Sequence, residues 1–175
     1  MELATYIDHT LLKPTATIND IRKLCKEAIK YQFCAVCVNA CYITLVKKEL
    51  GNSNIKIAAV IGFPLGATVT DAKIYEAVEC IESGADEIDM VINIGWLKSA
   101  EHELVEAEIR RIKEIIGSLC NRSHLTTSST GDETSLSCTC LEPIIDRSSG
   151  IYAGICGRRR CHWVILGRGR IRTDV

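Results

Sequence analysis

Asp89 is the residue whose type and position suit it best to acid–base chemistry. It lies in the apolar segment 87–94, which reads as a buried strand, and is flanked there by Ile88 and Met90. A carboxylate inside a buried strand is unfavourable unless it is paired or takes part in proton transfer. The pattern leaves two interpretations open: a catalytic proton donor and acceptor, or a structural acid bonded to a lysine or a backbone N–H.

Asp8, His9 and Thr10 form a second polar group, in the first predicted strand. Side chains of these types bond readily to nearby backbone, so a turn or cap network is the favoured interpretation. Lys13, just beyond them, is interpreted as a loop residue rather than a nucleophile.

The segment 62–66, Gly-Phe-Pro-Leu-Gly, follows the third predicted strand, where α/β enzymes place substrate loops. It matches neither a dinucleotide nor a P-loop fingerprint, and an ordinary strand-to-helix turn is the alternative. Cys34 and Cys37 have the spacing of a redox or metal motif, but they enter a strand and have no second such pair. We therefore expect packed free thiols and neither a metal nor a cofactor.

Four strand–helix units are expected to position these residues. Apolar runs predict the strands, and stripes at helical spacing predict the helices, such as Ile74, Val78 and Ile81 in the third helix. Thr17, followed three residues later by Asp20, indicates a helix start with a capping box, and Ser99 is predicted to cap the last helix. The predicted strands are 6–12, 35–38, 55–61 and 87–94, and the helices between and after them are about 17–29, 41–50, 70–84 and 99–116.

Strict alternation of strand and helix predicts a parallel sheet with right-handed crossovers. The fourth strand favours a barrel over an open doubly wound sheet. Its residues Ile88, Met90, Ile92 and Ile94 share one face, while Glu87, Asp89, Val91 and Asn93 share the other. Polar groups on one face suit the interior of a (β/α)8 barrel near its mouth, whereas an open sheet needs apolar residues on both faces.

Composition excludes several classes of protein. The chain has 175 residues, is 47% hydrophobic and 25% charged, and carries a net charge of −1, so neither wholesale disorder nor a global nucleic-acid-binding charge is expected. No apolar run reaches the roughly 18 residues of a membrane span, and residues 1–5 lack the features of a secretory signal. A cytoplasmic location and ten mostly unpaired cysteines are therefore expected.

The character of the sequence changes after Gly117. Residues 1–117 hold all ten lysines and a net charge of −4, whereas residues 118–175 hold eight arginines, no lysine and a net charge of +3. We interpret 118–175 as an irregular, poorly ordered tail with one short strand near residues 163–166. A reading-frame error or an unspliced segment would explain it. Cys138, Cys140 and the Cys161–His162 pair are weak metal-ligand candidates in it. The arginines 158–160 leave RNA binding open as a minor alternative.

Four segments together resemble the deoxyribose-phosphate aldolase family. They are 6–14 (YIDHTLLKP), 36–39 (VCVN), 60–66 (VIGFPLG) and 84–93 (GADEIDMVIN), in the family's order and spacing, and the resemblance covers about residues 5–117. It implies a (β/α)8 barrel, here present as its N-terminal half. It also implies reversible cleavage of 2-deoxyribose 5-phosphate to glyceraldehyde 3-phosphate and acetaldehyde through a lysine Schiff base, without a metal.

The resemblance assigns roles by position. Asp89 matches the proton donor and acceptor, Asp8 an acid of the supporting relay, and Cys37 and Asn93 line the substrate pocket. The Schiff-base lysine of the sixth strand has no counterpart, because no lysine follows Lys113. We therefore expect a lyase by family that is inactive as this chain. The alternative is a non-catalytic half barrel that self-associates, or binds a partner, through its open sheet edges.

Overall fold

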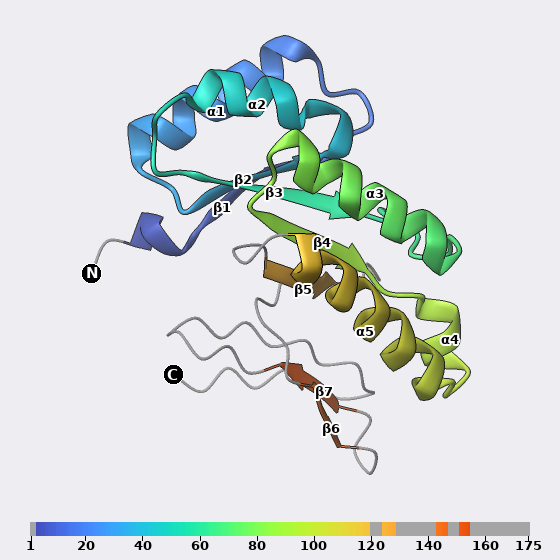
Figure 1. Cartoon of the computed structure of the whole chain (residues 1–175). Helices are drawn as coiled ribbons and strands as arrows, with labels where there is room; N and C mark the ends of the chain where they lie inside the picture. Colours follow the sequence, from blue (N-terminus) through green and yellow to red (C-terminus); the bar gives the residue numbers. More distant parts are fainter. Residues whose placement is uncertain (1–2, 120–123, 129–142, 147–150, 155–175) are drawn as a thin grey trace.

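A computed structural model describes residues 3–119, 124–128, 143–146 and 151–154. Its centre is a parallel sheet of five strands that lie side by side in chain order. Helices pack along one face of this sheet (Figure 1). This is part of a (β/α)8 barrel, and the four predicted strand–helix units are confirmed.

Strands and helices alternate along the chain. The strands of the sheet are β1 (Asp8–Leu11), β2 (Ala35–Asn39), β3 (Lys56–Ile61), β4 (Glu87–Val91) and β5 (His124–Ser128). The helices are α1 (Ile18–Tyr31), α2 (Ile43–Leu50), α3 (Thr70–Ser83), α4 (Ile94–Lys98) and α5 (His102–Leu119), with short 3-10 turns η1 (Leu3–Tyr6) and η2 (Ala40–Tyr42). A separate antiparallel pair joins β6 (Pro143–Asp146) to β7 (Ile151–Gly154).

The two faces of the sheet have different surroundings. The outer face meets the helices in the main hydrophobic core, where Ile88 and Met90 of β4 are fully buried. The face turned away from the helices, here called the inner face, carries a smaller apolar cluster. It consists of Cys37, Ala58 and Val60, with Leu12 and Phe63 packed against it. The predicted division of β4 into a helix-facing and an interior set is therefore confirmed for residues 87–91.

The start of α1 agrees with the capping box expected from the sequence. The Thr17 hydroxyl accepts a hydrogen bond from the Asp20 backbone N–H, and the Asp20 carboxylate accepts one from the Thr17 N–H at 2.8 Å. Ile21, Leu24 and Ala28 of α1 are buried, as the apolar stripe predicts. The helix thus begins where its own side chains satisfy its first backbone donors.

Replacing Thr17 with alanine should lower the free energy of unfolding by about 1 kcal/mol, because the Asp20 N–H loses its partner. Urea denaturation followed by circular dichroism measures the change. Thr15→Ala, at an exposed position two residues earlier, is the matched control and should leave the midpoint nearly unchanged. Equal losses in both variants would contradict a capping role.

The end of the fourth unit differs from the prediction. β4 ends at Val91 rather than at residue 94, and Ile94 begins the short helix α4. The Asn93 side chain caps that helix by accepting from the Trp96 N–H at 3.1 Å, which stops the strand. Ser99 is the C-cap of α4 and not the N-cap of the next helix, which begins at His102.

The buried side of α3 is displaced by one position from the predicted stripe. The sequence pattern favours Ile74, Val78 and Ile81, yet these are only half-buried. The fully buried residues of α3 are Lys73, Ala77 and Cys80. Lysine is rarely buried, so a prediction from hydrophobicity places Lys73 on the solvent side of the helix and Ile74 in the core. The structure shows Lys73 buried instead.

The sheet also extends beyond position 117, where the sequence pattern placed an irregular tail. β5 pairs in parallel with β4, with Asp89 opposite Thr126 and Val91 opposite Ser128. Its β-branched threonines suit a strand, and the edge of β4 offers the backbone groups that such a strand pairs with. The strand expected near residues 163–166 lies outside the described residues.

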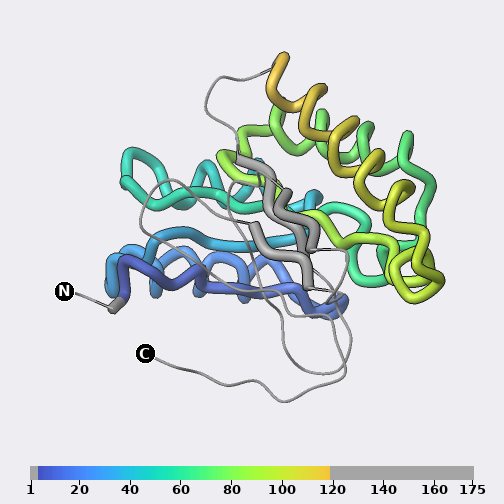
Figure 2. The backbone as a smooth tube through the Cα atoms, turned by 90° about the horizontal axis from the view of Figure 1, so that it is seen from below, coloured from blue at the N-terminus to red at the C-terminus, as the bar shows by residue number. Residues whose placement is uncertain are grey.

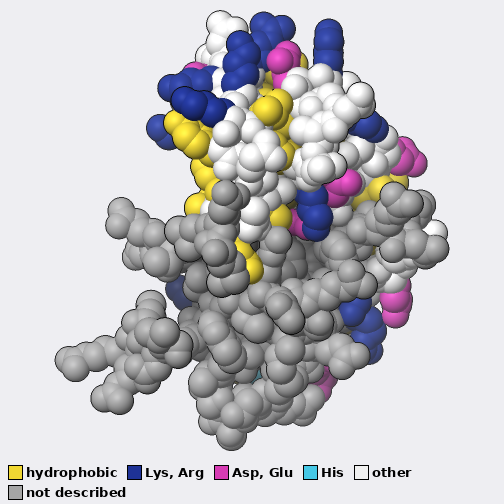
Figure 3. All heavy atoms as spheres, turned by 90° about the vertical axis from the view of Figure 1, so that its left-hand side faces the viewer, with side chains coloured by type: hydrophobic (Ala, Val, Ile, Leu, Met, Phe, Trp, Pro, Cys, Tyr) yellow, Lys and Arg dark blue, Asp and Glu magenta, His cyan; other side chains and the backbone are white. Residues whose placement is uncertain are grey.

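Charged side chains gather on the solvent faces of α1 and α2. Figure 3 shows Lys and Arg atoms at the end of the molecule where Figure 1 places these two helices. Exposed basic residues there include Arg22, Lys23 and Lys26 on α1 and Lys47 and Lys48 on α2.

None of the helices that the structure describes is both long enough and apolar enough to cross a membrane.

Candidate active site

Asp89 and Cys37 meet on the inner face of the sheet. The Cys37 thiol of β2 donates to an Asp89 carboxylate oxygen of β4 at 3.6 Å, across the intervening strand β3. β3 contributes Ala58 opposite Cys37 and Val60 opposite Asp89. The small side chain of Ala58 leaves room for this contact. The structure therefore brings together two of the four residues expected at the site.

Burial sets the acidity of Asp89. Its side chain is only 8% exposed, and this desolvation, with the nearby Asp8 carboxylate as the next cause, raises the pKa of Asp89 to about 7. The hydrogen bond from Cys37 opposes the rise, and Glu87 adds to it. A carboxyl that titrates near neutral pH can both give and accept a proton there, which is what general acid–base chemistry requires.

Cys37 is a thiol rather than a thiolate in this setting. Burial and the Asp89 and Asp8 carboxylates hold the pKa of Cys37 far above its usual range. The group is therefore a weak hydrogen-bond donor that lines the site and a poor nucleophile. Cys34 is half-buried directly before β2, which is compatible with the packing interpretation of the pair.

Asp8 acts on the site through its charge. It is half-buried on β1, and it raises the pKa of both Asp89 and Cys37. Thr10 on the same strand donates from its hydroxyl to the Asp8 carbonyl at 2.9 Å, a local contact of the kind the sequence favours. The electrostatic effect of Asp8 on both groups is compatible with a supporting acid, and the relay role stays a prediction.

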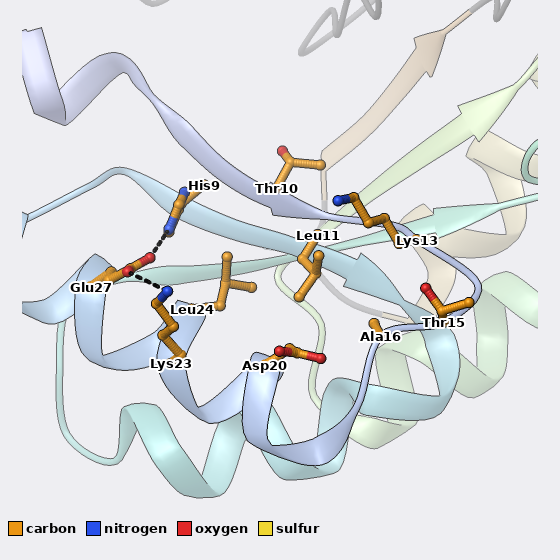
Figure 4. Close-up of a pocket in the computed structure, with 10 residues that line it drawn as sticks. All are labelled: His9, Thr10, Leu11, Lys13, Thr15, Ala16, Asp20, Lys23, Leu24 and Glu27. Atoms are coloured by element: carbon orange, nitrogen blue, oxygen red, sulfur yellow. Dashed lines mark hydrogen bonds and ion pairs between the residues drawn. The ribbon is translucent and has the colours of Figure 1, made fainter.

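His9 lies on the opposite face of β1 from this cluster. Its Nε2 is 2.9 Å from Glu27 of α1, and its ring is 5.0 Å from that of Phe33. Figure 4 shows His9, Glu27 and Lys23 in one pocket between β1 and α1. Lys13 also lines this pocket, and the volume of the pocket is about 390 Å³. This pocket is on the helix side of the sheet, so His9 and Lys13 belong to a different environment from Asp89.

The loop 62–66 borders the inner face, and its role as a substrate loop stays a prediction. Phe63 packs on the cluster around Cys37, and the Phe63–Pro64 peptide is cis. Gly66 has a φ of +65°, and a Cβ there would lie 2.0 Å from the Ile92 carbonyl oxygen. The loop can therefore approach the end of β4 this closely only with glycine at this position.

Asn93 stays a prediction as a pocket residue. Its side-chain oxygen caps α4, where it holds the backbone just beyond β4. It is half-buried.

Two buried acids were not recognised as paired from the sequence. Glu87, at the start of β4, forms an ion pair with Lys56 of β3, so it is part of the inner face and not outside the core. Glu108 of α5 pairs with the buried Lys73 of α3. The acid and lysine of each pair are more than 30 residues apart, and no local pattern links them.

No group of three or more potential metal ligands occurs within the residues that the structure describes. The candidates Cys138, Cys140, Cys161 and His162, and the arginines 158–160, lie outside those residues.

A parallel α/β half barrel with a buried acid on its inner face is the architecture of a barrel enzyme. The chain belongs to the DeoC/LacD family of aldolases, whose model matches residues 3–127. It is 58% identical over 114 residues to a deoxyribose-phosphate aldolase of Finegoldia magna, covering 65% of this chain and 54% of the relative. It is 54% identical over 114 residues to one of Clostridium novyi, covering 65% and 51%.

Solved structures agree with this assignment. A structure described as QR15, an aldolase, superposes with a TM-score of 0.66 at 30% identity, covering 73% of this chain and 55% of the other. The tetrameric deoxyribose phosphate aldolase of Aeropyrum pernix gives a TM-score of 0.57 at 31% identity, covering 71% and 51%. The chain spans about half the length of the curated relatives it matches. The family match ends ten residues beyond Gly117, so it includes nearly all of β5.

Proposed function

We propose that this chain carries the acid–base half of a deoxyribose-phosphate aldolase site. In the proposed reaction a lysine amine adds to the aldehyde of 2-deoxyribose 5-phosphate and loses water to form an imine. The carbon–carbon bond then breaks, releasing glyceraldehyde 3-phosphate and leaving an enamine. Protonation of the enamine carbon and hydrolysis release acetaldehyde and return the amine.

Asp89 is the proposed donor and acceptor in these proton transfers, with Asp8 as its supporting acid. The observation that carries the proposal is the buried Asp89 carboxyl on the inner face, in contact with Cys37 and titrating near neutral pH. Cys37 and Asn93 are the proposed lining of the pocket. The proposed partner is a sugar phosphate rather than a nucleic acid or a membrane, and the free thiols favour a reducing compartment such as the cytoplasm.

The amine is the missing component. No lysine follows Lys113, whereas the family resemblance places the reacting lysine on a later strand. We accordingly propose that the chain is inactive by itself. The related proposal, that a reading-frame error or unspliced segment follows the family-like part, is tested by the nucleotide sequence. If no alternative frame restores a lysine motif after the fifth strand, that explanation is wrong.

Borohydride trapping tests the missing amine directly. The chain is incubated with 2-deoxyribose 5-phosphate and sodium borohydride, and its intact mass is measured beside the aldolase of Finegoldia magna as a positive control. We expect an adduct on the control and none on this chain. An adduct on this chain would show that one of its ten lysines performs the Schiff-base step.

Trapping on a mixture tests the acid–base role. The chain is combined with the second half of the same relative, which would supply the later strands and their lysine. An adduct on the added half, together with aldolase activity that Asp89→Asn abolishes, is the expected result. A complex that co-elutes and traps substrate, yet is equally active with Asp89→Asn, would contradict the role of Asp89.

The order of the strands favours a second candidate function, a half barrel that associates through its sheet edges. Among the described strands, β1 and β5 stand at the two ends of a parallel sheet that does not close on itself. Strand edges pair readily with other chains. Light scattering after gel filtration should then show a discrete dimer, whereas a monomer or polydisperse aggregates would contradict this candidate.

A further inference from the structure

A buried ion pair links the two helices that cover the end of β4. Lys73 of α3 and Glu108 of α5 are both fully buried at their side chains, and Lys73 Nζ lies 2.8 Å from a Glu108 carboxylate oxygen. Figures 1 and 2 both show α3 and α5 side by side. The second Glu108 oxygen accepts from the Thr70 hydroxyl at 3.3 Å, so both carboxylate oxygens are bonded.

Lys73 also holds the backbone of the sheet. Its Nζ donates to the Val91 carbonyl oxygen at 3.0 Å, at the last residue of β4. Its stem fills the space beside Gly62, where an added Cβ would lie 2.9 Å from Lys73 Cε. One turn further along α3, Glu76 accepts from the Gly62 N–H at 2.8 Å. Helix α3 therefore fixes both the exit of β3 and the end of β4.

A buried ion pair of this kind is weak evidence of a stabilising role. Two charges lose their hydration when they are buried, and well-packed apolar residues of similar volume at such sites are often equally or more stabilising. Removal of one partner alone is strongly unfavourable, because it leaves the other charge buried and uncompensated. A pair of this kind is best explained by the geometry that it imposes on the groups it touches.

We propose that Lys73 and Glu108 are positioning residues, which hold the carboxyl end of β4 so that Asp89 stays in contact with Cys37 on the inner face. Asp89 precedes Val91 by two residues on the same strand, so the two side chains share the inner face. The Lys73 hydrogen bond acts on the Val91 backbone from the opposite side of the sheet. The catalytic importance of Asp89 rests on the proposed function. The positioning of Asp89 by Lys73 and Glu108 does not depend on it.

The environment of Asp89 reports on this positioning. The titratable groups that act on it are Asp8 from β1, Cys37 from β2 and Glu87 from its own strand. If the end of β4 loosens, water reaches the Asp89 carboxyl and reduces its desolvation. The titration midpoint of Asp89 then falls toward that of an ordinary aspartate.

The test is the titration of Asp89 in the whole chain, labelled with 13C at the aspartate carboxyl carbons and followed by NMR. The signal of Asp89 is assigned from its loss in Asp89→Asn. The principal variant is Lys73→Met combined with Glu108→Leu, which keeps the buried volume and removes both charges. We expect it to melt near or above the parent temperature and to lower the Asp89 midpoint by about one pH unit.

The matched control is the other ion pair between the same two helices. Arg111 of α5 lies 2.6 Å from Asp71 of α3, but both are exposed. Arg111→Gln with Asp71→Asn should leave the Asp89 midpoint unchanged. A folded Lys73→Met/Glu108→Leu variant with the parent midpoint would overturn the proposal.

If the double variant does not fold, Lys73→Met combined with Glu108→Gln decides the question. Glutamine keeps the shape of Glu108 and an acceptor for Thr70, and neither charge is left uncompensated, so a downward shift of the midpoint is again expected. An unchanged midpoint in this folded variant would also overturn the proposal. Trapping experiments are independent of this readout, so failure of the positioning role and failure of the aldolase proposal are distinguishable.

Discussion

Asp89→Asn is expected to raise the free energy of unfolding by about 4 kcal/mol at pH 8. The buried carboxyl has a pKa of about 7 in the folded chain, whereas its ordinary value is 3.8. Each unit of difference between the two pKa values corresponds to roughly 1.4 kcal/mol of folding free energy once the group is ionised in both states. Asparagine has the shape of the neutral acid and carries no charge to desolvate.

The effect has a defined pH window. Between pH 4 and 7 the folded chain keeps a proton on Asp89 that the unfolded chain has already released, so stability falls as the pH rises. Above about pH 7 the full destabilisation is present, and toward pH 4 it disappears. Urea denaturation of the parent and Asp89→Asn at pH 4, 6 and 8 should therefore give curves that diverge with increasing pH.

Asp71→Asn is the matched control, because that carboxylate is 74% exposed. Its stability should follow the parent at every pH. If the stability of the parent and that of Asp89→Asn changed in parallel with pH, the raised pKa of Asp89 would be contradicted. A confirmed gain would mean that the chain retains an acid that weakens its fold, which is common where a group is kept for chemistry.

Gly66→Ala should destabilise the chain by at least about 3 kcal/mol. The positive φ of +65° disfavours a side chain, and the new Cβ would lie 2.0 Å from the Ile92 carbonyl oxygen and 3.0 Å from Val91 Cγ1. Val91 is the last residue of β4 and Ile92 follows it directly, so backbone has to move. Thermal unfolding and urea midpoints measure the loss.

Gly51→Ala separates the two causes. Gly51 also has a positive φ, +55°, but nothing lies within 4 Å of the Cβ position. It should lose only the conformational part, about 1–2 kcal/mol. Equal losses at Gly51 and Gly66 would mean that the close approach of the loop to β4 has no energetic importance.

The sequence predicts the parts of this fold that depend on local patterns. Apolar runs locate β2, β3 and the start of β4, and the Thr17–Asp20 capping box locates α1. The alternation along β4 predicts that Asp89 faces away from the helices, which its contact with Cys37 confirms. These features depend on neighbours within a few residues along the chain.

The errors arise where distant segments decide the outcome. The pairing of Lys73 with Glu108 spans 35 residues, and it places a lysine in the core where periodicity favours Ile74. β5 forms because β4 provides a pairing edge, which no local property of 124–128 signals strongly. The cap that Asn93 forms on α4 ends the strand earlier than predicted. An apolar run alone does not show whether Ile94 continues a strand or begins a helix.

The strands lie in the sheet in the order in which they occur in the chain. Each strand from β2 to β5 therefore has a neighbour that a ribosome has already synthesised when that strand emerges. Local connections of this kind close short loops and form quickly, whereas pairing of distant segments is slow. The half barrel can thus grow by one strand–helix unit at a time during translation, and only closure of a complete barrel has to wait for the end of synthesis.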